Sequence, residues 1–187
     1  MKKLSLAILA ATTLMSGSAL ADNHTVSVGY AQSMMDNFKD IRGVNVQYRY
    51  EWDSAFSAIG SFSYMSGDED YADYSSGVGS LKAHTEIKYT SLLVGPAYRI
   101  NKYVSVYALG GLAYVKGDAD WKWGDAWGRT SHREKDSYNS TSFAWGAGVQ
   151  VNPTQDLAIS LGYEGTTADL GNDFSINGFN INVGYRF

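Results

Sequence analysis

The chain has 187 residues, a formal net charge of −4, two prolines and no cysteine. This length fits one domain, and the absence of cysteine excludes a fold that depends on disulfide bonds. An acidic chain without a basic cluster lacks the charge pattern of a nucleic-acid-binding protein. The motifs GxSxG and HExxH, a phosphate-binding loop and paired cysteines are absent from the sequence, so it carries no familiar catalytic or cofactor signature.

The N-terminus has the pattern of a secretory signal peptide. A basic start, MKK, is followed by the apolar run Leu4–Leu14 and by the small-residue segment Ala19–Ala21. This order is typical of a cleaved export signal, and the apolar run is too short to cross a bilayer as a helix. We therefore expect a signal peptide over residues 1–21 and a mature barrel domain over residues 22–187. Loss of the two lysines changes the formal charge to about −6.

Alternating apolar and polar residues predict eight β-strands in the mature chain. The segment Gly43–Trp52, GVNVQYRYEW, is the clearest, because valine, tyrosine and tryptophan occupy every second position. A period of two residues indicates a strand with two unlike faces. The expected strands cover residues 24–33, 41–52, 54–66, 85–100, 103–116, 138–151, 156–166 and 175–187. In the fifth, the weakest pattern, the expected apolar face consists of Val104, Val106, Ala108, Leu112 and Tyr114.

The connections between these strands alternate in length. Three are short and have residues typical of tight turns: Trp52–Ser54, Asn101–Lys102 and Asn152–Gln155. The others are expected to be loops, over residues 34–40, 67–84, 117–137 and 168–174. Short turns at one end and long loops at the other are typical of outer-membrane barrels, whose long loops lie outside the cell. An even number of strands also lets the sheet close without free edges.

The sizes of the side chains indicate which face is inside. One face of the strands is rich in glycine, serine, alanine and asparagine, and the other carries bulky apolar residues. Eight strands enclose a space that side chains just fill, so the small residues are expected inside and the bulky ones in lipid. A soluble, lipocalin-like barrel is the alternative. The predicted fold is an eight-stranded antiparallel transmembrane β-barrel with short periplasmic turns and long extracellular loops.

Polar residues on the small-residue face predict a network inside the barrel. Its expected members are Asn45, Gln47, Arg49, Glu51, Arg99, Glu164 and Arg186. An unpaired charge inside the barrel would be costly, so the arginines should meet Glu51, other acceptors or water. We interpret this network as a structural plug that leaves no pore, with a proton relay or a catalytic role as the alternative.

Several segments resemble the Ail/Lom family, the OmpX-like eight-stranded outer-membrane proteins. Gly43–Glu51 is similar to the family pattern GxNxKYRYE, with Gln47 where the family usually has lysine. Further similar segments are Ile59–Phe62, Gly95–Ile100 and Val183–Phe187. The last is similar to the closing GxGYRF, and Asn182 replaces the usual glycine. The resemblance covers nearly the whole mature chain and is weakest in the loops.

The resemblance implies a cell-surface protein with protruding loops. Some family members promote attachment to host cells and entry into them, some protect against complement, and others have no sharply defined activity. The expected function is therefore adhesion, invasion or complement resistance, and the alternative is a structural protein that supports envelope integrity. The resemblance also implies a signal for the outer-membrane assembly machinery in the last strand, at Phe179, Ile181, Val183, Tyr185 and Phe187.

The segment 117–137 is the most unusual of the expected loops. It contains Trp121, Trp123 and Trp127, three of the five tryptophans, together with Arg129. Trp121 and Trp123 are two residues apart and could share one face of a protruding hairpin. Exposed tryptophan with arginine is typical of an interaction hot spot, so we hypothesise that these four residues bind a host ligand or a surface glycan. Alternatively, the rings pack on each other or belong to the outer aromatic girdle.

The other loops give weaker signals. Asp68, Glu69, Asp70 and Asp73 lack the glycine and the terminal glutamate of an EF-hand loop. A solvated acidic loop is the simpler interpretation, and a bridge to lipopolysaccharide phosphates through divalent cations is the alternative. Residues of the types found in a hydrolase triad occur at Ser131, His132 and Glu134, but adjacency in sequence does not establish a triad.

These patterns favour a protein that is not an enzyme, with a small lipid-modifying enzyme as the less favoured alternative. We expect no catalytic residue, no metal and no cofactor. The expected partners are outer-membrane lipids and lipopolysaccharide, the outer-membrane assembly machinery, and host-cell-surface or serum proteins. We expect a monomer that does not bind nucleic acid and resides in the outer membrane.

Overall fold

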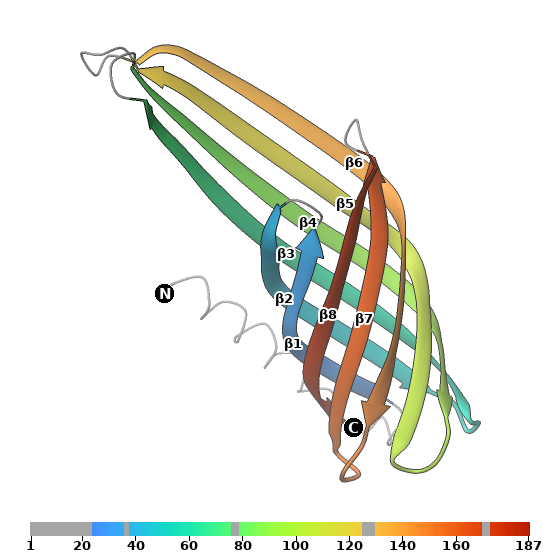
Figure 1. Cartoon of the computed structure of the whole chain (residues 1–187). Helices are drawn as coiled ribbons and strands as arrows, with labels where there is room; N and C mark the ends of the chain where they lie inside the picture. The colour runs from blue at the N-terminus through green and yellow to red at the C-terminus, as the bar shows by residue number, and fades with distance from the viewer. Residues whose placement is uncertain (1–23, 36–37, 76–78, 125–129, 170–172) are drawn as a thin grey trace.

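The computed structural model describes residues 24–35, 38–75, 79–124, 130–169 and 173–187. Eight antiparallel strands follow one another in chain order and close into a barrel (Figure 1). The strands are β1 (His24–Met35), β2 (Phe38–Glu51), β3 (Phe56–Ser75), β4 (Gly79–Arg99), β5 (Val104–Gly124), β6 (Thr130–Val151), β7 (Leu157–Asp169) and β8 (Asp173–Arg186). The predicted fold class is confirmed. No helix in this described part of the chain is long and apolar enough to cross a membrane.

Pairing between the first and last strands closes the barrel. Val28 of β1 pairs with Val46 of β2 on one side and with Val183 of β8 on the other. Near the chain ends, the backbone N–H groups of His24 and Phe187 each donate to the other residue's carbonyl oxygen, at 3.0 and 2.8 Å. Closure matters in a bilayer, because its hydrocarbon contains no water that could satisfy unpaired backbone groups.

The predicted faces of the strands are confirmed. In β4, Leu92 is 66% exposed on the outside of the barrel, whereas its neighbour Leu93 is 1% exposed and lies inside. The fifth strand follows the same rule, since Leu112 faces outward and Ala113 is buried. Bulky apolar residues thus cover the outside of the barrel, as a surface in contact with lipid requires.

The three predicted short turns lie together at one end of the barrel, between β2 and β3, β4 and β5, and β6 and β7. Asn101 organises one of them, because its Oδ1 accepts hydrogen bonds from the N–H groups of Tyr103 and Val104 at 2.8 and 2.9 Å. In another, Thr154 Oγ1 accepts the N–H of Leu157 at 3.2 Å. These side chains replace backbone partners in the turns, which is the role expected of asparagine and threonine there.

The segments 67–84 and 117–137, which were expected to be long loops, consist largely of paired strands that form two long hairpins. Strands β3 and β4 stay paired out to Ser75 and Gly79, and β5 and β6 stay paired out to Gly124 and Thr130. Figure 1 shows these four strands reaching far past the ends of β1, β2, β7 and β8. In these segments apolar and polar residues no longer alternate, because neither face of the strands has to contact lipid or fill the barrel. The backbone hydrogen bonds between the strands nevertheless continue in the same register.

The loops expected at 34–40 and 168–174 are also shorter than predicted. Strand β1 continues to Met35 and β2 begins at Phe38, while β7 ends at Asp169 and β8 begins at Asp173. The extracellular side of the barrel therefore consists mainly of continued strands. The four-stranded part beyond the pairing row of Gly67, Ile87, Gly117 and Tyr138 is called the projecting sheet below.

Candidate functional site: the barrel interior and the projecting sheet

Three arginines converge on Glu51 at the periplasmic end of the barrel interior. Glu51 Oε1 lies 2.7 Å from Arg49 Nη2. Its Oε2 lies 3.1 Å from Arg99 Nη2 and 2.6 Å from Arg186 Nη2. Arg49 is also held by Ser57, whose Oγ accepts its Nε–H at 3.0 Å. Because Arg49 is only 1% exposed, the carboxylate is needed to offset its buried charge.

Gln47 lies at the centre of a network of uncharged side chains, two residues before Arg49 on the same face of β2. Its Oε1 accepts the hydroxyl of Ser160 at 2.7 Å, and its Nε2 donates to Tyr107 and Asn180 at 3.4 Å each. Asn182 Nδ2 donates to Ser160 and to Asn180 at 3.2 and 3.0 Å. The glutamine that replaces the usual family lysine thus uses both ends of its amide, and it joins β2 to β5, β7 and β8.

Glu164 belongs to a different group from the arginines. Its Oε1 accepts the hydroxyl of Tyr89 at 2.5 Å, and its Oε2 accepts that of Ser63 at 3.0 Å. Asn45 Nδ2 donates to Ser61 and Ser63 at 2.8 and 2.9 Å, which ties this group to β2 and β3. The expected network residues therefore lie in three adjoining groups along the barrel rather than in one continuous ion network.

Two tyrosines inside the barrel were not among the predicted site residues. Tyr89 and Tyr107 are 1% and 5% exposed, and both contact the polar groups just described. Gly148 and Gly162 make room for Tyr107, because a Cβ at either position would lie within 2.6 Å of its hydroxyl oxygen. The strand alternation could have located both rings, since each occupies an inward position of its strand.

An apolar layer closes the extracellular side of the interior. Its members are each no more than 7% exposed and come from five different strands: Ile41, Met65, Ile87, Val115 and Ile176. Together with the polar groups below, this layer fills the barrel. The described interior is that of a packed plug, consistent with the small enclosed volume of an eight-stranded barrel.

The outside of the barrel carries two aromatic belts with a band of apolar residues between them. Near the turns, outward-facing rings include Tyr48, Trp52, Phe56, Tyr98, Tyr103 and Tyr185. Toward the other end they include Tyr30, Tyr64, Tyr114 and Tyr163. Aromatic side chains favour the two membrane–water interfaces, so the belts mark the edges of the bilayer.

Basic residues lie just outside the outer belt and form one pairing row. Arg42 pairs with Ser66, Ser66 with Lys88, and Lys88 with Lys116. They share the outward face with Tyr64 and Tyr114, which lie two residues closer to the membrane centre. Arg42, Lys88 and Lys116 are called the basic row below.

An acidic row follows two residues further out, at Asp68, Glu86 and Asp118. Lys88 Nζ lies 2.8 Å from Glu86 Oε1, and Lys116 Nζ lies 3.1 Å from Asp118 Oδ2. Asp68 was expected in a solvated acidic loop with Glu69, Asp70 and Asp73, and all four belong to β3. The charges at the base of the projecting sheet are therefore ordered by the strand register.

The projecting sheet has open edges among the described residues. Pairing of β3 with β2 ends at Ser66, and pairing of β6 with β7 ends at Ala144. Beyond these points β3 pairs only with β4, and β6 pairs only with β5, within the part of the chain that the structure describes. Each edge is a row of backbone N–H and C=O groups without a strand partner.

Two of the four expected ligand-binding residues lie in this sheet. Trp121 pairs with Ala83 of β4 and Glu134 of β6, and Trp123 pairs with Leu81 and His132. The strand backbone is described here, while the side chains of these residues lie outside the description. Trp127 and Arg129 lie outside the described residues altogether. Ser131, His132 and Glu134, which have the residue types of a hydrolase triad, all belong to β6.

The residues of the expected assembly signal lie in and just after β8. Phe179, Ile181, Val183 and Tyr185 face outward at alternate positions. Phe187 stacks with the rings of His24 and Tyr185 at centroid distances of 5.9 and 6.3 Å. His24 also contacts Tyr48, with Nδ1 2.6 Å from the hydroxyl oxygen.

Within the described residues, no group of three or more histidine, cysteine, aspartate or glutamate side chains could hold a metal ion.

Comparisons with known proteins agree with this architecture. The family model for the Enterobacterial Ail/Lom protein matches residues 1–187. The chain is 47% identical to the virulence membrane protein PagC of Salmonella typhimurium, over 100% of both chains. It is 36% identical to the attachment invasion locus protein of Yersinia enterocolitica, over 89% of this chain and 87% of that protein.

A solved structure is similar as well. The crystal structure of Ail from Yersinia pestis, in complex with the heparin analogue sucrose octasulfate, superimposes with a TM-score of 0.68 and 32% identity. The match covers 89% of this chain and 99% of that one. The chain therefore belongs to the Ail/Lom family of eight-stranded outer-membrane barrels.

Proposed function

We propose that this protein acts at the cell surface, where the projecting sheet contacts host molecules in adhesion, invasion or complement resistance. The observation that carries the proposal is the four-stranded sheet that continues beyond the outer aromatic belt (Figure 1). The filled interior supports it too, because a packed plug offers no route for a transported solute. Relatives described as a virulence membrane protein and as attachment invasion locus proteins support the same assignment.

The open edges of β3 and β6 suggest how the sheet would engage a partner. An extended segment of a host protein can add as a further strand and satisfy the free backbone groups. Such binding depends on main-chain hydrogen bonds and requires little of the side chains, which suits a surface that meets varied partners. The crystal structure of Ail was solved in complex with the heparin analogue sucrose octasulfate, which supports a sulfated glycan as a second kind of ligand for this protein.

Trp121, Trp123, Trp127 and Arg129 are proposed as the ligand-contacting side chains of this region. Tryptophan and arginine dominate hot spots because they combine a large contact area with a polar or charged group. We expect replacement of all four by alanine to reduce attachment of expressing bacteria to host cells, with the surface amount of the protein unchanged. Unchanged attachment would remove these residues from the proposal.

The strand register allows a sharper test of the sheet itself. Asp118 and Ser137 are pairing partners, so residues 119–136 can be replaced by an Asn-Gly turn that joins them. Asp68 and Glu86 are partners too, and residues 69–85 can be replaced in the same way. We expect these truncations to leave the barrel intact and to lower host-cell attachment or serum survival.

The same strains separate this proposal from a purely structural role. Parental attachment and serum survival in the doubly truncated strain would contradict it. Normal attachment together with increased detergent sensitivity would favour a protein that supports envelope integrity. Surface amounts are compared by antibody labelling, and folding by the heat-dependent shift in gel mobility that intact barrels show.

The basic row supports a second proposed role, contact with lipopolysaccharide. Arg42, Lys88 and Lys116 lie where phosphates of the outer leaflet meet the barrel, and guanidinium and ammonium groups bind phosphate well. We expect Lys88→Gln with Lys116→Gln to weaken lipopolysaccharide binding by the refolded protein, and Lys102→Gln at the opposite end to leave it unchanged. Equal binding by all three proteins would contradict this role.

The route to the membrane is also a proposal. We infer that residues 1–21 are removed on export, that the outward residues of β8 with Phe187 recruit the assembly machinery, and that the folded barrel is a monomer. N-terminal sequencing of the protein from outer membranes should begin at Asp22. Deletion of Phe187 should lower the amount that reaches the outer membrane, and unchanged amounts would contradict the proposed signal.

A further inference from the structure

Three cationic residues occupy directly paired positions in the projecting sheet. Lys82 of β4 pairs with Lys122 of β5, and Lys122 pairs with Arg133 of β6. The same row continues on β3 at Ala72, the partner of Lys82. Neighbouring strands lie about 4.8 Å apart, so the three cationic positions form a line about 10 Å long across the sheet. Lys82, Lys122 and Arg133 are called the upper basic row below.

The upper basic row lies on the face of the sheet that continues the outside of the barrel. Lys82 is six residues from Lys88 along β4, and the pairing of β4 with β5 is regular over this distance. Lys122 is likewise six residues from Lys116 along β5. An even number of residues along a strand leads back to the same face, so Trp121, one residue before Lys122, belongs to the opposite face.

The rows next to the upper basic row do not neutralise it. Towards the membrane, the next row on this face consists of Asp70, His84, Asp120 and Lys135. Lys135 offsets one of the two aspartates, so with a neutral histidine that row has a formal charge of −1 against +3 for the upper basic row. Away from the membrane, the next row contains the uncharged residues Tyr74, Ser80 and Gly124. Like charges at directly paired positions destabilise a sheet, so a bound anion would stabilise this arrangement.

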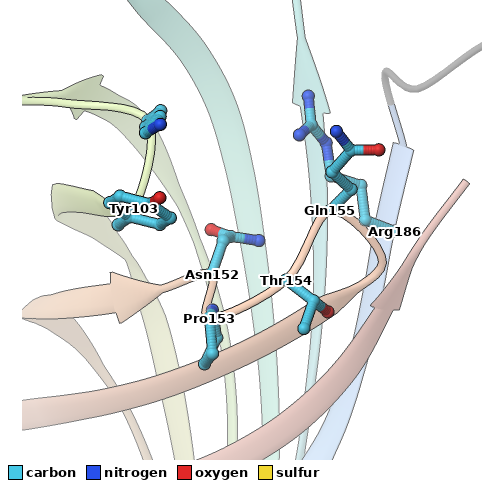
Figure 2. Close-up of a pocket in the computed structure, with 7 residues that line it drawn as sticks. Tyr103, Asn152, Pro153, Thr154, Gln155 and Arg186 are labelled. Atoms are coloured by element: carbon cyan, nitrogen blue, oxygen red, sulfur yellow. The ribbon is translucent and has the colours of Figure 1, made fainter.

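Cations at the base of the sheet and at the periplasmic end have acidic or aromatic neighbours. In the basic row, Lys88 and Lys116 are paired with carboxylates of the acidic row. At the periplasmic end, Arg186 lines a cavity of about 580 Å³ among the turns (Figure 2), and its guanidinium lies 2.6 Å from Glu51. Lys102 lies 4.9 Å from the centre of the Tyr103 ring. The upper basic row differs from these because its cationic residues are one another's partners in the strand register.

The height of the upper basic row indicates which anion it meets. Six residues of a strand span about 20 Å. Strands of outer-membrane barrels tilt by about 40° from the membrane normal, so the upper basic row lies about 15 Å further from the membrane than the basic row. Phosphates at the membrane surface are therefore nearer to the basic row. A linear polymer with closely spaced anionic groups, such as a sulfated polysaccharide, matches a line of cations at intervals of about 5 Å.

We propose that the upper basic row binds a sulfated polysaccharide of the host-cell surface, with Lys122 at the centre of the site. Ammonium and guanidinium groups form charge-assisted hydrogen bonds with anionic oxygens, and one polymer lying across three strands would engage all three cations. This inference rests on the sulfated-glycan part of the proposed function and assigns that ligand to one face of the projecting sheet. The open edges and the face that carries Trp121 are left to other partners.

The test uses the full mature barrel refolded in octyl glucoside. Isothermal titration calorimetry measures the binding of a heparin octasaccharide, of the same octasaccharide after chemical desulfation, and of lipopolysaccharide. We expect the sulfated octasaccharide to bind, with an affinity that falls as salt is added, and the desulfated one not to bind. Lys122→Gln should weaken binding about tenfold, the usual effect of losing one charge-assisted hydrogen bond. Lys122→Arg should retain the affinity, and Lys82→Gln tests the row at a second position.

Lys135→Gln is the matched control, because it removes one positive charge from the same face in the row that contains two aspartates. It should change the affinity by less than about threefold, since an exposed charge beside carboxylates contributes little. The heat-dependent gel shift checks that the barrel of each variant is folded.

The outcomes separate the site from the proposed function on which it rests. Equal affinities of the parent, Lys82→Gln and Lys122→Gln would overturn the site, while binding of the octasaccharide by all three would leave the sulfated-glycan role in place. No binding by the parent would overturn both. An equal loss in Lys135→Gln would also overturn the site, because the effect would then be one of net charge. Lipopolysaccharide binding that depends on Lys122 as strongly would overturn the host polysaccharide as the occupant.

Discussion

Replacement of Glu51 by glutamine would remove the carboxylate on which Arg49, Arg99 and Arg186 converge. Glutamine keeps the shape of the side chain and can still accept one hydrogen bond, so the variant changes mainly the charge. Arg49 is the residue most affected, because it is buried while the other two arginines reach the periplasmic opening. We expect Glu51→Gln to lower the free energy of unfolding by about 3–5 kcal/mol.

The geometry of the Arg49–Glu51 pair sets this magnitude. Nη2 and Oε1 are 2.7 Å apart, and only 2% and 6% of the two side chains are exposed. At an effective dielectric constant of about 20, two unit charges at this distance attract each other by about 6 kcal/mol before desolvation is subtracted. The side chains of Arg99 and Arg186 are 35% and 24% exposed, so water can hydrate them after the change and they add little.

Unfolding by guanidinium chloride in lipid vesicles, followed by tryptophan fluorescence, measures the effect. The double variant Arg49→Gln with Glu51→Gln removes both buried charges and should recover most of the lost stability, since the cost arises from one unpaired ion. A loss below about 1 kcal/mol for Glu51→Gln would refute the reasoning. Equal instability of the single and double variants would also refute it, because the buried charge of Arg49 would then not be the cause.

Three further substitutions, with Gly117→Ala as a control, test other parts of the interior by the same unfolding assay. Gly95→Ala should destabilise by about 3 kcal/mol or more, because its Cβ would lie 2.0 Å from the carbonyl oxygen of Ala108. Gly117→Ala, with nothing within 4 Å of its Cβ, is the matched control and should cost nothing measurable. Glu164→Gln should change stability by less than about 1 kcal/mol, because no cation among the described residues contacts this carboxylate. The amide oxygen can still accept one of the two hydroxyl groups, and the amide N–H can donate to the oxygen of the other. Gln47→Lys, which introduces the usual family residue, should cost about 3 kcal/mol, because the new charge would lie among neutral partners. A stable Gln47→Lys variant or a badly unfolded Glu164→Gln variant would show that charges in this interior are balanced by groups other than those identified.

The strand positions and their facing could be predicted because they depend on local pattern. Leu92 and Leu93 are the same residue type, yet their opposite positions follow from the alternation of their neighbours alone. The assignment of small residues to the inside needed one further fact, the narrow interior of an eight-stranded barrel. Both arguments use short stretches of sequence, and the structure confirms both.

The length of the strands could not be predicted in the same way. Residues 67–84 and 117–137 are polar and show no period of two, because neither face of the projecting sheet has to meet lipid or fill the barrel. Their strand structure depends on the ladders already established below them. Alternation in the sequence therefore predicts a strand only where one face of that strand is buried or contacts lipid.

The sequence by itself determined the barrel, the membrane-facing side and the presence of polar residues inside, because side-chain alternation and residue size are local properties. The tertiary structure decided which of those residues meet. Closure brings Gln47 to Ser160 and Asn180, partners 113 and 133 residues away along the chain. Among the described residues, closure also brings three arginines to Glu51 and the hydroxyl donors Ser63 and Tyr89 to Glu164. Two glutamates with the same local pattern thereby acquire opposite electrostatic surroundings, since the closed register of all eight strands sets the neighbours of each.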